Sequence, residues 1–130
     1  MATTDSNAAA SEASIDRAII ERAADAADVE VGRLCDALVV LHADLIGRHA
    51  QFERDCDYVT VDGTRAYRVP DDEFDALLDG FGFDEAERLG AQYAHTEQAK
   101  LLFAQSVRGD DNFGRDELGV VIGIDTAEQF

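Results

Sequence analysis

The sequence predicts an α+β domain that is mostly helical, with four helices, a β-hairpin and a third, C-terminal strand. Apolar residues recur every three or four positions over several stretches, which is the period of a helix packed on one side. An Asp-Gly pair at 62–63 separates two short alternating runs, as in a two-residue hairpin. Because 130 residues is the size of one domain, we expect a flexible acidic tail over 1–12 and a single domain over 13–130.

The first helix is expected over 14–28, where one modest apolar stripe has helical spacing. Ser11 or Ser14 is placed to cap it, because a serine hydroxyl accepts hydrogen bonds from the free amides of a first turn. The stripe consists of Ile15, Ile19, Ala23 and Ala26.

A long central helix is expected over 29–55, where apolar residues alternate at spacings of three and four in a heptad-like seam. Val39, Val40 and Ile46 widen this seam, which indicates a helix packed on more than one side. We therefore expect the seam to form the centre of the core. Its members are Val31, Leu34, Leu38, Leu41, Leu45 and Phe52.

The hairpin is expected over 58–69, and Pro70 with the acids after it predicts a short helix that ends at Gly80. Asp84 is expected to cap a last helix that runs to about Arg108. The β-branched run at 118–124 predicts the third strand, added to the hairpin. The apolar stripe expected for the last helix is Leu89, Tyr93, Thr96, Lys100, Phe103 and Val107.

The charge is unusual for a domain with a regular apolar pattern. The chain has 28 acidic and 11 basic residues, a net charge of −17, and Lys100 is its only lysine. In molar salt the Debye length is about 3 Å, so a dense acidic surface no longer destabilises a compact fold. The composition is similar to that of haloarchaeal cytosolic proteins in general. We expect a halophilic host.

The expected location is cytoplasmic, with no membrane partner. No run approaches the roughly 18 apolar residues that cross a bilayer, and the first 12 residues do not resemble a signal peptide. Two cysteines without a secretory signal are typical of a reducing compartment.

Four residues of zinc-ligand type recur at intervals of seven in the predicted long helix: Cys35, His42, His49 and Cys56, with Glu53 one turn after His49. A step of seven residues rises about 10.5 Å along a helix, too far for one ion to bridge consecutive members. We therefore expect no metal and no cofactor. No catalytic triad stands out, and His95 is expected on a helix surface, so the sequence favours a protein that is not an enzyme.

The segment 47–70 has no net charge, because four arginines balance four carboxylates there. An uncharged surface on an otherwise acidic protein suggests a contact, although a packed hairpin with little exposed surface would give the same pattern. We expect a non-catalytic interaction or regulatory protein that forms a homodimer, or binds a protein partner, through the long helix and the hairpin. The expected interface residues are Val39, Ile46, Arg48, Arg54, Tyr58, Arg65, Tyr67 and Arg68.

Two alternatives remain open. The first is a nucleic-acid-binding regulator that uses the 58–69 hairpin as a wing, with Arg65 and Arg68 on phosphates. It is less favoured, because the preceding helix is long for a recognition helix and molar salt weakens phosphate binding. The second is a metal-dependent enzyme built on the cysteine and histidine residues named above.

Overall fold

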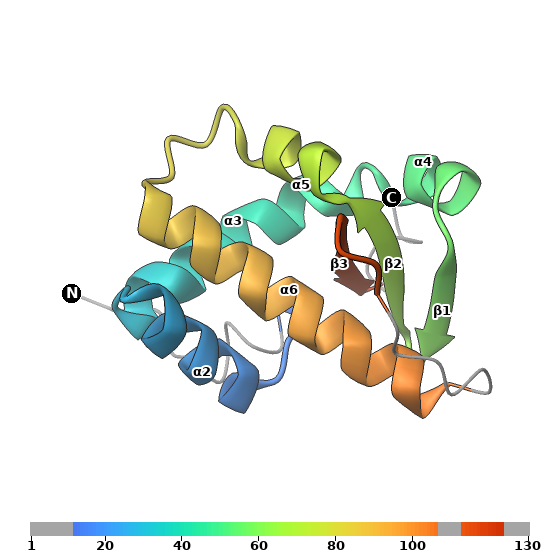
Figure 1. Cartoon of the computed structure of the whole chain (residues 1–130), viewed down its shortest axis with the longest axis horizontal. Helices are drawn as coiled ribbons and strands as arrows, with labels where there is room; N and C mark the ends of the chain where they lie inside the picture. The colour runs from blue at the N-terminus through green and yellow to red at the C-terminus, as the bar shows by residue number, and fades with distance from the viewer. Residues whose placement is uncertain (1–11, 107–112, 124–130) are drawn as a thin grey trace.

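The computed structural model describes residues 12–106 and 113–123, which form the predicted α+β fold. These ranges contain five helices and one antiparallel sheet in the order β1-β2-β3. Figure 1 shows α6 crossing one face of the sheet, with α2 beside it. The helices are α2 (Arg17–Ala27), α3 (Val31–Ile46), α4 (His49–Asp55), α5 (Asp71–Leu78) and α6 (Glu85–Gln105), and the strands are β1 (Tyr58–Val61), β2 (Thr64–Pro70) and β3 (Glu117–Gly123).

The prediction of one long helix over 29–55 is wrong, and it explains why there are five helices rather than four. The chain leaves the helical range at Arg48, where φ is −111° and ψ is 1°, and α4 begins at the next residue. A continuous helix would place Phe52 about 10 Å beyond Leu45 along its axis. The turn instead brings Phe52 back to the core, with its ring centroid 5.3 Å from that of Tyr67.

The predicted seam of α3 is confirmed as part of the core. Leu34, Leu38, Leu41 and Leu45 are fully buried within the chain's own fold. Of the residues that widen the seam, Val39 and Ile46 are partly buried against the core, whereas Val40 is 49% exposed. The described chain therefore covers most of this helix by itself.

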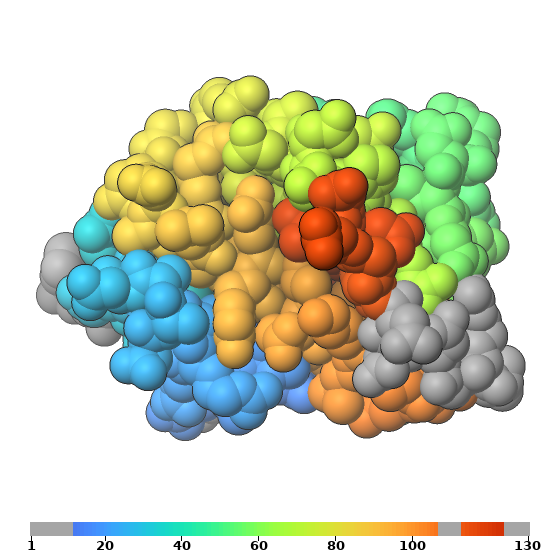
Figure 2. All heavy atoms as spheres, viewed as in Figure 1, coloured from blue at the N-terminus to red at the C-terminus, as the bar shows by residue number. Residues whose placement is uncertain are grey.

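The stripe predicted for the last helix is wrong in its first two members, because Leu89 is 51% and Tyr93 37% exposed. Figure 2 shows part of α6 reaching the surface beside α2. The buried side carries small residues instead, since α6 lies very close to the sheet: a Cβ on Gly119 would lie 2.3 Å from the Cβ of Ala99. The buried residues of α6 are Gly90, Ala91, Ala94, His95, Thr96, Gln98, Ala99, Leu102 and Phe103.

The hairpin turn, the start of α5 and the cap of α6 lie where they were predicted. Asp62 and Gly63 have φ values of 49° and 78°, the left-handed conformation that a two-residue hairpin turn requires. Pro70 ends β2 and occupies the N-cap position of α5. Asp84 caps α6 in a capping box, where its side chain accepts from the amide of Glu87 at 2.8 Å and the Glu87 side chain accepts in return at 2.9 Å.

The first helix and the last strand lie close to their predicted positions. Ser14 does not cap α2, because Asp16 occupies the N-cap position, and Ala26 is exposed where Ile20 and Ala24 are buried. The third strand is confirmed, paired with β2 from Pro70 opposite Glu117 to Thr64 opposite Gly123. The predicted cap Ser11, nearly all of the predicted tail, the helix end near Arg108 and residue 124 lie outside the described residues. Within the described ranges, no helix combines the length and the hydropathy that a membrane span needs.

Candidate functional site

The hydrogen-bond pattern of the sheet determines which backbone groups point away from it. The amide of Arg68 donates to the carbonyl of Asp57 at 2.9 Å, which makes these two residues a hydrogen-bonded pair. Such pairs alternate along an antiparallel ladder. The backbone groups of Tyr58 and Thr60 therefore point outward from β1. The same alternation applies to the pairing of β2 with β3. The backbone groups of Gly119, Val121 and Gly123 therefore point outward from β3.

The outer edge of β3, here called the sealed edge, is closed by three side chains from two helices. The Gly119 amide donates to Oγ1 of Thr96, and the Val121 amide donates to Nδ1 of His95, both at 3.1 Å. The Gly123 amide donates to Nε2 of His42, also at 3.1 Å. Side-chain acceptors satisfy these three amides, and the fourth outward amide of β3, that of Glu117, donates to the carbonyl of Gly114 at 3.1 Å.

Both imidazoles of the sealed edge must be neutral, because a ring nitrogen that accepts a hydrogen bond carries no proton. Burial, and to a smaller extent the nearby His42, lowers the pKa of His95 to about 3. Burial also lowers the pKa of His42. Because its Nδ1 accepts, His95 carries its proton on Nε2, which is buried and has no hydrogen-bond partner among the described residues. The ring of His95 meets that of Phe74 edge-on, at 5.8 Å between centroids.

The outer edge of β1, here called the open edge, has no such cover. Between described residues, no hydrogen bond reaches the outward amides and carbonyls of Tyr58 and Thr60. Figure 1 shows β1 at the outer side of the sheet. Natural edge strands are commonly protected by charged side chains, proline or bulges. β1 has the sequence YVTV, without a charge or a proline, and it is only four residues long.

Arg65 and Arg68 are engaged within the fold, on opposite faces of β2. Arg65 pairs with Glu53 at 3.2 Å, lies 4.5 Å over the ring of Tyr58 and donates to the hydroxyl of Thr60. Arg68 pairs with Asp57 at 2.9 Å and lies over the aromatic rings packed on the α6 side of the sheet, 4.5 Å and 5.1 Å away. Two residues lie between these arginines on a strand whose side chains alternate, so the two arginine side chains point to opposite faces.

The other predicted interface residues are dispersed. Arg48 pairs with Asp44 at 2.6 Å, and Arg54 is exposed in the last turn of α4. Tyr67 is fully buried, burial raises its pKa, and its hydroxyl donates to the carbonyl of His49 at 3.2 Å. Tyr58 is half-buried and packs on Tyr67 at 5.7 Å. The four arginines of segment 47–70 do not converge on one free surface.

The candidate metal ligands are also separated. Cys35 and His42 lie buried on α3, whereas His49 and Glu53 lie on α4 beyond the turn. No group of three histidine, cysteine, aspartate or glutamate side chains in the described ranges is arranged to hold a metal ion. Cys35 and Cys56 are free thiols, and burial raises the pKa of both.

A family model described as a domain of unknown function, DUF8048, matches residues 13–124. The chain belongs to this family. The matched range includes all eight helices and strands named above, and with them both edges of the sheet. No curated protein and no solved structure matches the chain.

The sealed edge of this DUF8048 domain could not be recognised from spacing alone. His95 was expected on a helix surface and is fully buried. It lies among alanines, and the small residues around it signal a helix in close contact with the sheet. That signal marks the correct face of α6, whereas the large residues Leu89 and Tyr93 point to the wrong one.

Proposed function

We propose that this protein is a non-catalytic interaction domain of a salt-adapted organism, which self-associates through the open edge of β1. The observation that supports it is the contrast between the two edges of one sheet. The sealed edge has every outward amide satisfied, while at the open edge no described residue bonds to the outward backbone groups of Tyr58 and Thr60, which can pair with another strand.

A second copy of the chain fits this edge. In an antiparallel pair around a two-fold axis, Tyr58 of one copy opposes Thr60 of the other, and Val59 lies on the axis. This arrangement forms four backbone hydrogen bonds, each worth about 1 kcal/mol net. The result is a weak dimer whose population depends on concentration.

Charge favours the same location. Two molecules of net charge −17 repel, and β1 lies in the neutral segment 47–70. Arg65 and Arg68 are already paired there with Glu53 and Asp57. Contact through this segment therefore brings together less like charge than the average over the chain.

The proposal differs from the sequence-based one in the element that carries the interface. The α3 seam was expected to need a partner, but its leucines are buried by the chain itself. The nucleic-acid alternative is weaker, since Arg65 and Arg68 would have to exchange their carboxylate partners for phosphates.

Light scattering in molar potassium chloride, over a range of protein concentrations, tests the proposal with three variants of Thr60. Wild type should pass from monomer to dimer mass as its concentration rises. Thr60→Pro removes the outward amide, and proline is tolerated on an open edge, so this variant should stay monomeric. Thr60→Lys should also stay monomeric, because a charged lysine on an edge strand disfavours pairing with a second strand.

Thr60→Val is the matched control. It removes the same hydroxyl and the same hydrogen bond from Arg65, yet it keeps the outward amide, so it should dimerise like wild type. A wild-type monomer at every concentration would contradict the proposal, as would a dimer that persists in both Thr60→Pro and Thr60→Lys. If DNA retention, rather than dimer mass, were lost on replacing Arg65 and Arg68 with glutamate, the nucleic-acid alternative would take its place.

A further inference from the structure

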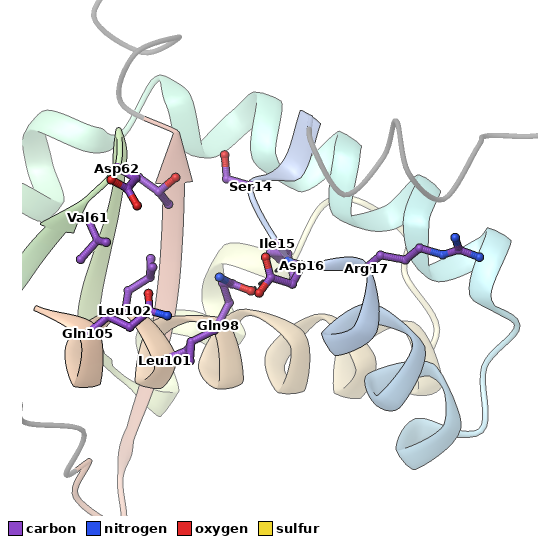
Figure 3. Close-up of a pocket in the computed structure, with 11 residues that line it drawn as sticks. Ser14, Ile15, Asp16, Arg17, Val61, Asp62, Gln98, Leu101, Leu102 and Gln105 are labelled. Atoms are coloured by element: carbon purple, nitrogen blue, oxygen red, sulfur yellow. Dashed lines mark hydrogen bonds between the residues drawn. The ribbon is translucent and has the colours of Figure 1, made fainter.

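A hollow of about 470 Å³ lies between the start of α2, the tip of the hairpin and the last turns of α6. Figure 3 shows Val61 and Asp62 of the hairpin on one side and Ser14 and Asp16 on the other. Leu101, Leu102 and Gln105 of α6 also line it. Neither edge of the sheet uses this space, so it is independent of the proposed dimer.

Gln98 is the residue that makes the hollow chemically specific. Its side chain is only 5% exposed, and its Oε1 accepts from the backbone amide of Asp16 at 2.9 Å. That bond fixes the orientation of the carboxamide, because only the oxygen can accept from an amide. The Nε2 group therefore points elsewhere, with two donors that no described residue accepts, and Figure 3 shows it on the hollow side of the Gln98–Asp16 bond. Such a group requires an acceptor oxygen.

The rim of the hollow favours a positive charge. Asp16 and Asp62 both line it, and the hydroxyls of Ser14 and Thr64 are further acceptors. Arg17 belongs to the same lining, but its side chain extends away from the other residues in Figure 3 and pairs with Glu21 at 3.6 Å. Among the described lining residues, a ligand carboxylate would thus meet two carboxylates and no cation that faces it, whereas an ammonium group would be stabilised.

We propose that the hollow binds a small primary amine that also carries a neutral oxygen acceptor, as an amino alcohol does. The ammonium group lies at the Asp16–Asp62 rim, and the oxygen accepts from Nε2 of Gln98. The apolar floor, which includes Ile15 and Leu102, contacts the carbon chain between them.

The test measures amide chemical-shift changes in the full chain, at the lowest salt concentration that keeps the native circular dichroism. Ethanolamine is the probe. Ethylamine lacks the oxygen, and glycine replaces the neutral oxygen by a carboxylate. Ethanolamine should shift the amides of Ser14, Asp62 and Thr64 and should bind about tenfold more tightly than either analogue, since it alone can accept the hydrogen bond from the Gln98 carboxamide through a neutral oxygen.

Two variants separate the two contacts. Gln98→Glu keeps the acceptor for the Asp16 amide and removes the donors, so the preference for ethanolamine over ethylamine should vanish. Asp62→Asn keeps the left-handed turn, which asparagine tolerates, and should weaken both amines while leaving their ratio unchanged. Asp25→Asn, with the same charge change at the far end of α2, should alter neither. Absence of shifts at the hollow, equal binding of ethanolamine and ethylamine to wild type, or a preference that survives Gln98→Glu would each overturn the proposal.

Discussion

At the scale of single residues, His42 and His95 hold the sealed edge through lone pairs, not through protons. Each ring accepts from an amide of β3 and each is buried. A buried amide that loses its acceptor costs about 1–3 kcal/mol. The two histidines are therefore expected to matter as acceptors, although His42 was first a candidate metal ligand and His95 was expected on a helix surface.

The acceptor role predicts a difference between two replacements of His42. Glutamine can place an oxygen near the position of Nε2, so His42→Gln should lower the free energy of unfolding by less than 1 kcal/mol or so. His42→Leu has a similar size but no acceptor for the Gly123 amide, and should cost about 1–3 kcal/mol. Urea unfolding at constant molar salt measures both. Equal losses would show that the Gly123 hydrogen bond contributes nothing.

The lowered histidine pKa values predict a loss of stability in mild acid. In the unfolded chain a histidine has a pKa of about 6.5, while His95 in the fold has a pKa of about 3. Below about pH 6.5 the unfolded state takes up a proton that the native state does not bind. Each fully shifted histidine should then lower the free energy of unfolding by about 1.4 kcal/mol per pH unit. The contribution of the neutral histidines to the free energy of unfolding is complete above pH 6.5 and declines steadily towards pH 3.

Urea unfolding at pH 7, 6 and 5 in molar salt measures this slope. His42→Gln removes one of the two titrating rings, so its slope should be shallower than that of wild type. A flat profile for wild type between pH 7 and pH 5 would mean that the histidines titrate alike in both states, and would exclude their role as neutral acceptors.

At the scale of elements, the position of α6 depends on small residues on both sides of its contact with β3. A methyl group on Gly119 would lie 2.3 Å from the Cβ of Ala99 and 3.2 Å from the Cα of Thr96, so helix or strand must move. Gly119→Ala is expected to cost about 1–3 kcal/mol. Because Thr96 also accepts from the Gly119 amide, the same shift disturbs the sealed edge.

Gly47→Ala is the control for this prediction. Gly47 has an ordinary φ of −74°, and an added Cβ would lie in ordinary contact with the carbonyl oxygen of Asp44, at 3.5 Å. Its replacement should be neutral or slightly stabilising, because alanine restricts the unfolded chain. Thermal unfolding of both variants tests the prediction. Equal melting temperatures for Gly119→Ala and wild type would rule out the close approach of α6 to β3.

The sequence predicted those elements whose signals are local. Asp62-Gly63 needs a left-handed turn, and Asp84 with Glu87 forms a capping box, so both appear where they were expected. The turn at Arg48 has no local breaker stronger than Gly47; it results from the packing of Phe52 on Tyr67 across the domain. His95 was wrongly expected on the surface for the same reason. The face of α6 that carries His95 is buried only because the sheet packs against it. Which face of α6 is buried depends on non-local packing, and the spacing of large residues does not predict it.

At the scale of the whole molecule, the net charge of −17 predicts that the fold depends on salt. Repulsion between surface carboxylates extends about 10 Å at 0.1 M salt and only about 3 Å at 1 M. Helical circular dichroism should therefore decrease on dialysis into dilute buffer and recover in molar potassium chloride. A melting temperature that is the same in both buffers would contradict a halophilic origin.

The unequal edges of the sheet are the central claim, and residue-resolved amide exchange at two protein concentrations tests it most directly. The amides of Gly119, Val121 and Gly123 should be protected at both concentrations, because their acceptors belong to the same chain. Those of Tyr58 and Thr60 should exchange quickly in dilute protein and become protected only as dimers form. Protection of Tyr58 and Thr60 that does not change with concentration, or fast exchange along β3, would contradict the account.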